Sequence, residues 1–331
     1  MGGDHGHVVT VPAAFRILAK HDDVDIILVG NETILRQAVV DQNNAALSRR
    51  ITIKHASEEI AMDDLPSKAL RNKKDSSMRI AINLVKDGIA HACVSAGNTG
   101  ALVAVAHFVL KTLPGISRPA ITTHFPTVIP NKNTLILDLG ANVDSEEGYL
   151  FQLAVMGTVL SSAIDSIDKP KVALLNIGSE EIKGNEQIKR AAQVLANSEH
   201  INYVGFVEGS DIFKGNVDVI VCDGFIGNIV LKTIEGVLDL VKFHVKKNML
   251  QSWFTKLTAA LALPLLMRFQ KDIDPEKYNG ATLVGLKGIV VKSHGGAKVA
   301  AFTSALEKAV VEVARNVPQR ISDELAKILK S

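Results

Sequence analysis

The sequence predicts an α/β protein of three layers, in which helices cover both faces of a mostly parallel sheet. Short runs rich in Val, Ile and Leu alternate with longer stretches of helical periodicity along the 331 residues. The short runs are continuously apolar, which is typical of strands that are buried on both faces. Hydrophobic residues make up 47% of the chain, and no Pro- or Gly-rich linker divides it. We therefore expect a single domain over residues 1–331.

Nine apolar runs are the expected strands. In chain order they cover residues 24–30, 51–55, 90–95, 120–125, 134–139, 171–177, 203–206, 217–222 and 283–292. Helices should fill most of the gaps, because parallel strands need long crossover connections. Residues 242–271 interrupt this rhythm, since they are amphipathic and are divided by Pro264. We expect a helical hairpin there that protrudes from the domain as an insertion for membrane or partner contact.

Charge, cysteine content and hydropathy exclude several classes of protein. The formal net charge of +2 is too small to indicate nucleic-acid binding. Cys93 and Cys222 lie in separate apolar runs, which is typical of buried thiols and favours neither a disulfide nor a metal site. No apolar stretch reaches the roughly 18 residues of a membrane-spanning helix, and the N-terminus lacks the features of a signal peptide. We expect a cytoplasmic protein.

The motif SAGNTGAL (95–102) follows one of the expected strands. In open α/β sheets, ligands bind beyond the carboxyl ends of strands, where helix N-termini attract anions. The motif brings together the hydroxyls of Ser95 and Thr99, the amide of Asn98, and Gly97, which allows backbone to approach a ligand closely. These residues would form an oxyanion cradle, or else a turn with an ordinary helix cap.

Four further motifs follow expected strands. They are LDLGANVD (137–144), NIGSEEIKGNE (176–186), CDGFIGNIVLKT (222–233) and GLKGIVVKSHGG (285–296). Lys183 and Lys232 are candidate cations for a phosphate, although either could be a solvated helix residue. Asp4 and His5 could form an acid/base or orienting pair, or belong to a polar turn. The recurrence of such motifs at strand ends favours an anion site.

Several common catalytic motifs are absent from the sequence. We find no GxGxxG after a strand, no GxxxxGK[ST], no GxSxG and no HExxH. Dinucleotide, P-loop, nucleophile-elbow and zincin chemistries therefore lose their usual support. Nothing in the sequence indicates a covalent nucleophile.

Together with MGGDHG (1–6), these motifs resemble the PlsX family of phosphate acyltransferases over nearly the whole chain. The resemblance implies a fold akin to phosphotransacetylases and isopropylmalate dehydrogenases, and a homodimer. It also implies transfer of a long-chain fatty acyl group from acyl carrier protein to inorganic phosphate, which gives acyl phosphate for the acylation of glycerol 3-phosphate in phospholipid synthesis. Family members usually begin with a short apolar strand ahead of MGGDHG, whereas this sequence begins on that motif.

The resemblance also suggests roles for the candidate residues. Because a thiol leaves readily, the reaction needs positioning and oxyanion stabilisation, and no metal or organic cofactor. We predict that Lys183 and Asn228 are catalytic, with Lys183 holding phosphate and Asn228 serving the oxyanion. The further substrate- and phosphate-binding candidates are Asp4, His5, Ser95, Gly97, Asn98, Thr99, Asp138, Asn142, Asn185, Asp223, Lys292 and His294.

The expected hairpin has the composition of a peripheral membrane contact. The residues predicted to enter the membrane interface are Trp253, Phe254, Leu257, Leu261 and Leu265. The alternative is a dimer-interface or core helix pair. Membrane contact would place the protein at the inner face of the cytoplasmic membrane, beside a downstream glycerol-3-phosphate acyltransferase.

Three alternatives to this function stay open at the level of sequence. The first keeps the enzyme class and replaces the carrier protein with acyl-CoA. The second is an oxidoreductase of the isopropylmalate dehydrogenase type, and the third is a non-catalytic scaffold that gathers carrier protein and acyltransferases.

Overall fold

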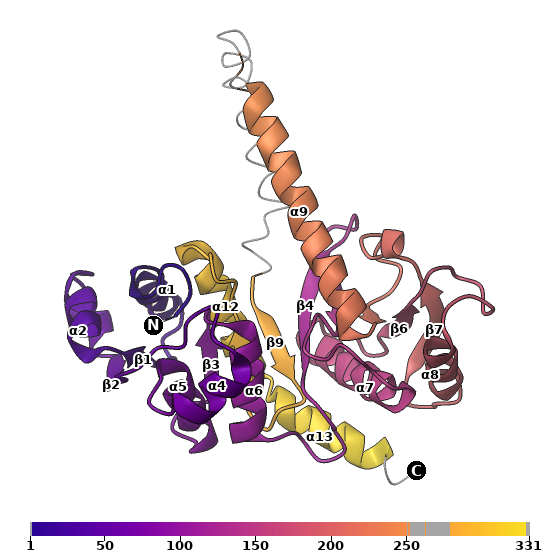
Figure 1. Cartoon of the computed structure of the whole chain (residues 1–331), viewed down its shortest axis with the longest axis horizontal. Helices are drawn as coiled ribbons and strands as arrows, with labels where there is room; N and C mark the ends of the chain where they lie inside the picture. Colours follow the sequence, from indigo (N-terminus) through magenta and orange to yellow (C-terminus); the bar gives the residue numbers. More distant parts are fainter. Residues whose placement is uncertain (1, 250, 252–261, 263–278, 329–331) are drawn as a thin grey trace.

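The computed structural model describes residues 2–249, 251, 262 and 279–328, and its main body is built on an eight-stranded sheet (Figure 1). The strands lie in the order β3 (Ala92–Ser95), β10 (Ile289–Lys292), β9 (Ala281–Val284), β4 (Ala120–Pro126), β5 (Asn133–Leu137), β8 (Val219–Val221), β6 (Lys171–Leu175) and β7 (Asn202–Val207). Two further strands, β1 (Ile26–Gly30) and β2 (Ile51–His55), form a separate parallel pair. The predicted α/β class is confirmed.

The main sheet changes direction near its centre. Strand β10 is parallel to β3, whereas β9 is antiparallel to both β10 and β4, and β4 is antiparallel to β5. From β5 onward, through β8, β6 and β7, the pairings are parallel. The carboxyl ends of β3 and β10 therefore point opposite to those of β5, β8 and β6, which divides the strand-end motifs into two groups.

The expected strand over 283–292 is wrong as a single element. The structure has two antiparallel strands there, β9 and β10, joined by a turn. Gly285 has a φ of 90°, which lies in the left-handed region that glycine adopts at little cost, and the chain reverses at this point.

Helices cover both faces of the sheet, so the protein has the three layers that the sequence predicts. On one face α7 (Glu147–Ile164), α8 (Glu186–Ala196) and α13 (Val317–Ile328) bury Leu135 and Leu137 of β5. On the other face α5 (Ser77–Lys86), α6 (Thr99–Leu110) and the first turns of α9 (Gly224–Met249) bury Ile136. Successive residues of one strand thus enter opposite cores, as expected for a strand without a solvent-facing side.

Two helices join the small parallel pair to the main sheet. Helix α12 (Val299–Ala314) packs on β10 and β3 and against α1 (His7–Lys20). Helix α1 in turn shares a core with β1, β2, α2 (Glu32–Val40) and α3 (Ala45–Ser48). The remaining short elements are α4 (Pro66–Asn72), beside α6, and a 3-10 turn at Gly209–Asp211.

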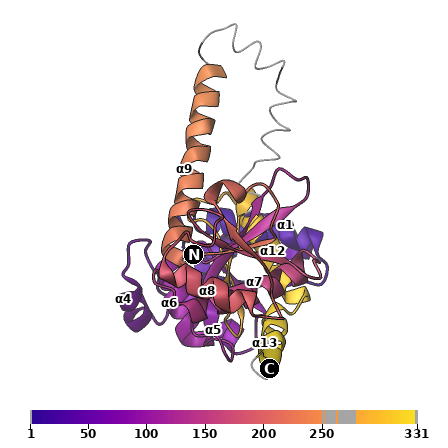
Figure 2. The same cartoon turned by 90° about the vertical axis from the view of Figure 1, so that its right-hand side faces the viewer.

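Helix α9 is 26 residues long, and its second half stands clear of the rest of the described protein (Figures 1 and 2). The first part of the expected hairpin, residues 242–249, belongs to this helix. Trp253, Phe254, Leu257, Leu261 and Leu265 lie outside the described residues, so membrane contact stays a prediction. Within the part of the chain that is described, no helix is long and apolar enough to cross a bilayer.

Candidate active site

The first group of candidate residues gathers where β3 and β10 end. Lys292 and Ser95 are directly paired residues of these two strands. The Ser293 N–H donates to the Ser95 carbonyl oxygen (2.8 Å), and the Asp4 N–H donates to the Gly295 carbonyl oxygen (3.0 Å). The motifs MGGDHG, SAGN and KSHGG, which are far apart in the sequence, therefore form one loop cluster.

Small residues allow these loops to approach one another. A Cβ atom at Gly3 would lie 2.9 Å from the Cβ of Ala96, and one at Gly2 would lie 3.6 Å from the Cα of Gly97. The Gly97 N–H donates to the Ser95 hydroxyl at 3.2 Å, which holds the turn that follows β3. The three loops are consequently closely packed beyond the ends of β3 and β10, where Lys292 lies beside Ser95.

Lys292 is buried, with 8% of its surface exposed. Its ammonium donates to the Ser293 carbonyl oxygen, and among the described residues no carboxylate lies within ion-pair distance of its Nζ. The pKa of Lys292 is lowered to about 8, chiefly by burial and also by the positive charge of Lys232, while the negative charge of Asp4 opposes the shift. A buried ammonium without a counter-charge is costly, so this position favours an anion that arrives with the substrate.

Asn98 has a positioning role in this cluster. Its side-chain oxygen accepts from the Ala101 N–H (3.0 Å) and so caps α6. Its amide nitrogen lies within hydrogen-bond distance of the carbonyl oxygens of Ala61 (3.3 Å), Met62 (2.8 Å) and Asp64 (3.0 Å). Because its amide is already engaged, Asn98 fixes the loop before α4 against the start of α6.

The other predicted members of the cluster are more exposed. Thr99, His5 and His294 all have exposed side chains, and the His294 ring accepts from the Gly296 N–H at 3.1 Å. Sequence reasoning missed Asn279, whose amide donates to Ser293 (2.7 Å) and whose oxygen accepts from the His294 N–H (3.0 Å). No motif marks Asn279, because its partners come from the loop after β10.

The second group lies beyond the carboxyl ends of β5, β8 and β6. Asp138 is fully buried and accepts from the backbone N–H groups of Ile121 (3.0 Å), Gly140 (3.1 Å), Ala141 (2.9 Å) and Asn142 (2.9 Å). Burial raises the pKa of Asp138, and these hydrogen bonds oppose the rise. Asp138 therefore organises the turn from inside.

Asn142 completes this turn. Its side-chain nitrogen lies 2.8 Å from Asp138, 2.8 Å from the Pro119 carbonyl oxygen and 2.7 Å from the Tyr149 hydroxyl. The Tyr149 hydroxyl donates in turn to the Pro119 carbonyl oxygen at 3.2 Å. Like Asp138, Asn142 is engaged within the protein and positions its neighbours.

Helix α9 begins in close contact with the same turn. A Cβ atom at Gly227 would lie 1.8 Å from the Asp138 carbonyl oxygen, and one at Gly224 would lie 2.2 Å from the Asn142 carbonyl oxygen. The Asn228 side chain lies against Gly140 and is exposed. Its amide makes no hydrogen bond with a described residue, so Asn228 is available to a ligand.

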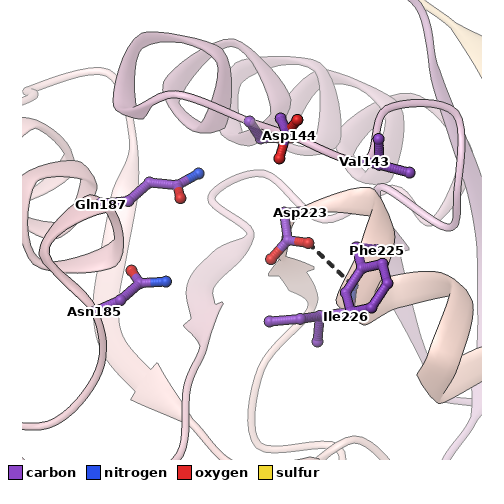
Figure 3. Close-up of a pocket in the computed structure, with 8 residues that line it drawn as sticks. Val143, Asp144, Asn185, Gln187, Asp223, Phe225 and Ile226 are labelled. Atoms are coloured by element: carbon purple, nitrogen blue, oxygen red, sulfur yellow. Dashed lines mark hydrogen bonds between the residues drawn. The ribbon is translucent and has the colours of Figure 1, made fainter.

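A pocket of about 470 Å³ opens between the 143–145 loop and the first turns of α8 and α9 (Figure 3). Asp223 caps α9 by accepting from the Ile226 N–H at 3.0 Å, and Asn185 caps α8 by accepting from the Ile188 N–H at 2.9 Å. The pocket is lined by Val143, Asp144, Ser145, Asn185, Gln187, Asp223, Phe225 and Ile226. Sequence reasoning singled out only Asn185 and Asp223 of these.

Lys183 lies on the loop between β6 and α8. Its Nζ is 3.6 Å from the Glu180 carboxylate, and its side chain is 45% exposed. No contact among the described residues joins it to Lys292 or Lys232, and Lys292 belongs to the other half of the sheet, beyond the directional change. Its predicted catalytic role stays a prediction.

Known proteins resemble this chain over nearly its whole length. The family model described as "Fatty acid synthesis protein" matches residues 1–320. The chain belongs to this family. The phosphate acyltransferase of Coxiella burnetii (strain Dugway 5J108-111) is 56% identical over 330 residues, which cover 100% of this chain and 96% of the relative. That of Nitrosococcus oceani is 55% identical over 325 residues, covering 98% and 94%. The predicted PlsX-type family is confirmed, and the chain is an acyltransferase of fatty acid and phospholipid synthesis.

Solved structures support the fold. A phosphotransacetylase from Streptococcus pyogenes has a TM-score of 0.58 and 19% identity, covering 93% of this chain and 91% of that one. The EutD phosphotransacetylase from Staphylococcus aureus has a TM-score of 0.57 and 18% identity, covering 92% and 89%. The expected phosphotransacetylase-like architecture is confirmed.

Proposed function

We propose that the chain transfers a long-chain fatty acyl group from the thioester of an acyl carrier protein to inorganic phosphate. Membership of the family supports acyl transfer and disfavours the dehydrogenase and scaffold alternatives. The observation that carries the choice of phosphate as acceptor is Lys292, a buried ammonium that has no carboxylate partner among the described residues.

The phosphate would bind at the end of β10. Lys292 would hold one phosphate oxygen, and Lys232, which lowers the pKa of Lys292 through its own charge, would approach from α9. Backbone N–H groups of the Ser95–Thr99 turn and the hydroxyls of Ser95 and Thr99 would complete the site. Asp4 and His294 would border it from the other two loops.

The reaction needs no covalent enzyme intermediate. An oxygen of HPO₄²⁻ attacks the thioester carbonyl carbon, and a C–O bond forms as the carbonyl becomes an oxyanion. The C–S bond then breaks, and the leaving sulfur takes up the proton that the phosphate carried. The products are acyl phosphate and the free thiol of the carrier, so atoms and charge balance.

Asn228 is the proposed donor to the oxyanion. It lies four residues before Lys232 on α9, which places the two side chains on one face and about 6 Å apart along the helix axis. Removing one such donor typically costs about 100- to 1,000-fold in kcat. Lys183 is the second candidate cation, and comparing Lys183→Ala with Lys292→Ala would identify the one that binds phosphate.

The remaining parts of the proposal concern partners. Acyl phosphate would serve the acylation of glycerol 3-phosphate, and the chain would act as a homodimer. Peripheral contact with the inner face of the cytoplasmic membrane would involve the segment that follows α9, next to the positive charges of Lys242, Lys246 and Lys247 in the last turns of that helix.

The deciding experiment is the consumption of purified palmitoyl carrier protein with and without inorganic phosphate, with acyl phosphate trapped as the hydroxamate. We expect turnover that depends on phosphate and that falls about 100-fold or more in Asn228→Ala. Asn197→Ala, which removes an exposed amide at the end of α8, is the matched control. Turnover that is independent of phosphate would refute the proposal.

A further inference from the structure

We propose that the pocket between the 143–145 loop, α8 and α9 binds the uncharged pantetheine arm of the donor, and that its carboxylates select against nucleotide thioesters. This inference rests on the proposed function and adds the recognition of the second substrate. The pocket volume of about 470 Å³ lies within the range of small-molecule sites.

The polar groups of the pocket match an amide-bearing ligand. Asn185 and Asp223 each use one side-chain oxygen to cap a helix, which leaves the Asn185 amide nitrogen and the second Asp223 oxygen available. The Gln187 amide makes no hydrogen bond with a described residue. Figure 3 shows Asn185, Gln187 and Asp223 around a common space. A pantetheine arm has two amide groups, whose N–H groups suit the carboxylate and whose carbonyl oxygens suit the side-chain amides.

The pocket is lined by acidic residues, whereas the proposed phosphate site is built around a cation. Asp144 and Asp223 line the pocket, and none of its lining residues in the described part of the chain is Lys or Arg. An adjoining hollow of about 280 Å³ shares Asp144 and adds Glu146, Glu147 and Glu186, with Arg190 as its one cation among the described lining residues. Free phosphate is therefore repelled from this side and attracted to Lys292.

The same charge discriminates between donors. The arm of a carrier protein has a single phosphodiester where it joins the protein, whereas the nucleotide of coenzyme A has a diphosphate and a further phosphate. Phosphate groups near Asp144 and the neighbouring glutamates would be repelled. The pocket accordingly favours a thioester carried by a protein.

Helix α9 connects the pocket to the reacting centre. Phe225 lines the pocket, and Asn228 and Lys232 follow it on the same side of the helix. Seven residues separate Phe225 from Lys232, which is about 10 Å along the helix axis. An arm that lies in the pocket with its sulfur directed along α9 brings the thioester to Asn228 and to the cations. The exposed rings and methyl groups of Phe225 and Val143 would cover the arm's hydrocarbon portions.

The first test compares Gln187→Ala with Gln193→Ala, an exposed glutamine six residues further along α8. We expect Gln187→Ala to raise the KM for the acyl donor roughly 3- to 10-fold, the effect of one lost hydrogen bond, and to leave the KM for phosphate unchanged. The control should change neither. An unchanged donor KM in Gln187→Ala, or a change confined to phosphate, would overturn the assignment.

The second test replaces Asp144 with Asn and measures kcat/KM for palmitoyl-CoA and palmitoyl carrier protein. Loss of the charge should shift the ratio several-fold toward the CoA donor, whereas Glu199→Gln, an exposed carboxylate beyond α8, should not shift it. The same ratio in Asp144→Asn and wild type would overturn donor selection by charge.

Calorimetry with pantetheine alone separates this inference from the proposed function. Weaker binding by Gln187→Ala than by wild type supports the pocket even if phosphate-dependent turnover fails. No binding by wild type at millimolar pantetheine, or equal binding by both proteins, counts against the pocket even if turnover succeeds.

Discussion

Replacing Lys292 with Met should stabilise the protein near neutral pH and impair its use of phosphate. The pKa of Lys292 falls from the ordinary 10.5 to about 8 in the folded state, chiefly because the ammonium is buried. A difference of about 2.5 units corresponds to roughly 3 kcal/mol of destabilisation while the group is charged in both states. The hydrogen bond from Lys292 to the Ser293 carbonyl oxygen offsets about 1 kcal/mol of this penalty. Lys292→Met should therefore raise the free energy of unfolding by about 2 kcal/mol at pH 7.

The sign of the pH dependence follows from the depressed pKa. Below pH 8 the folded and unfolded states are both protonated, and the full penalty applies; above pH 10.5 both are neutral, and it vanishes. The free energy of unfolding of the wild type should therefore increase as the pH rises from about 8 to 10.5. Lys292→Met should lack this increase. For the enzyme, kcat/KM for phosphate should fall as pH rises through about 8, because the free site loses its charge.

Denaturant unfolding and phosphate kinetics measured on the same variant test both halves of this reasoning. Loss of a charge-assisted hydrogen bond of about 1.5–3 kcal/mol should raise the KM for phosphate by about 10- to 150-fold. Lys287→Met, an exposed residue of the turn before β10, is the control and should alter neither quantity much. A Lys292→Met protein that is less stable and has an unchanged KM for phosphate would refute the assignment of an anion site.

Three further predictions concern buried residues, two of which lie in the candidate site. Asn98→Asp keeps the cap of α6 but replaces the amide N–H groups with an oxygen facing backbone carbonyls, so it should lower the free energy of unfolding by roughly 2–3 kcal/mol in denaturant titrations. Gly227→Ala should cost roughly 2–4 kcal/mol by thermal unfolding, because its Cβ would lie 1.8 Å from the Asp138 carbonyl oxygen, whereas Gly236→Ala on the same helix meets nothing and should stabilise slightly. Burial raises the pKa of Glu312 to about 7, so the free energy of unfolding of the wild type should decrease as the pH rises from 4.5 to 7. Glu312→Gln should remove this decrease. Parallel plots of the free energy of unfolding against pH for the two proteins would contradict the prediction.

The strands of the sheet could be predicted from the sequence because their signal is local. Every apolar run that we selected contains a strand. The signal is clearest in central strands such as β5 and β8, where burial on both faces favours continuous Val, Ile and Leu. Strand direction has no comparable signal, so neither the reversal at β4 nor the turn between β9 and β10 follows from hydropathy. The GLKG sequence at 285–288 contains the glycines of that turn, but it lies inside an otherwise apolar run.

Positions in the candidate site were easier to predict than roles. Asp138, Asn142 and Asn98 are polar residues at strand ends, as expected, but each is engaged by other parts of the protein. Their partners come from loops that only the tertiary structure brings near. Lys292 illustrates the converse, because neither its burial nor the nearby charge of Lys232, 60 residues earlier in the sequence, has a local sequence signal.

The order of strands in the sheet has a consequence for how the protein folds. Strands β10 and β9, from the last sixth of the chain, lie between β3 and β4 and make the only sheet pairings that join those two strands among the described residues. During synthesis the two halves of the sheet must wait for residues 281–292 to leave the ribosome before they can be joined. Strands so far apart in the sequence can pair only after a long loop closes, which lowers the entropy of the chain before the stabilising contacts form. Folding should therefore be slow and completed late. The loops around Lys292 can then assemble only at the end, which means that a partly synthesised chain lacks the proposed phosphate site.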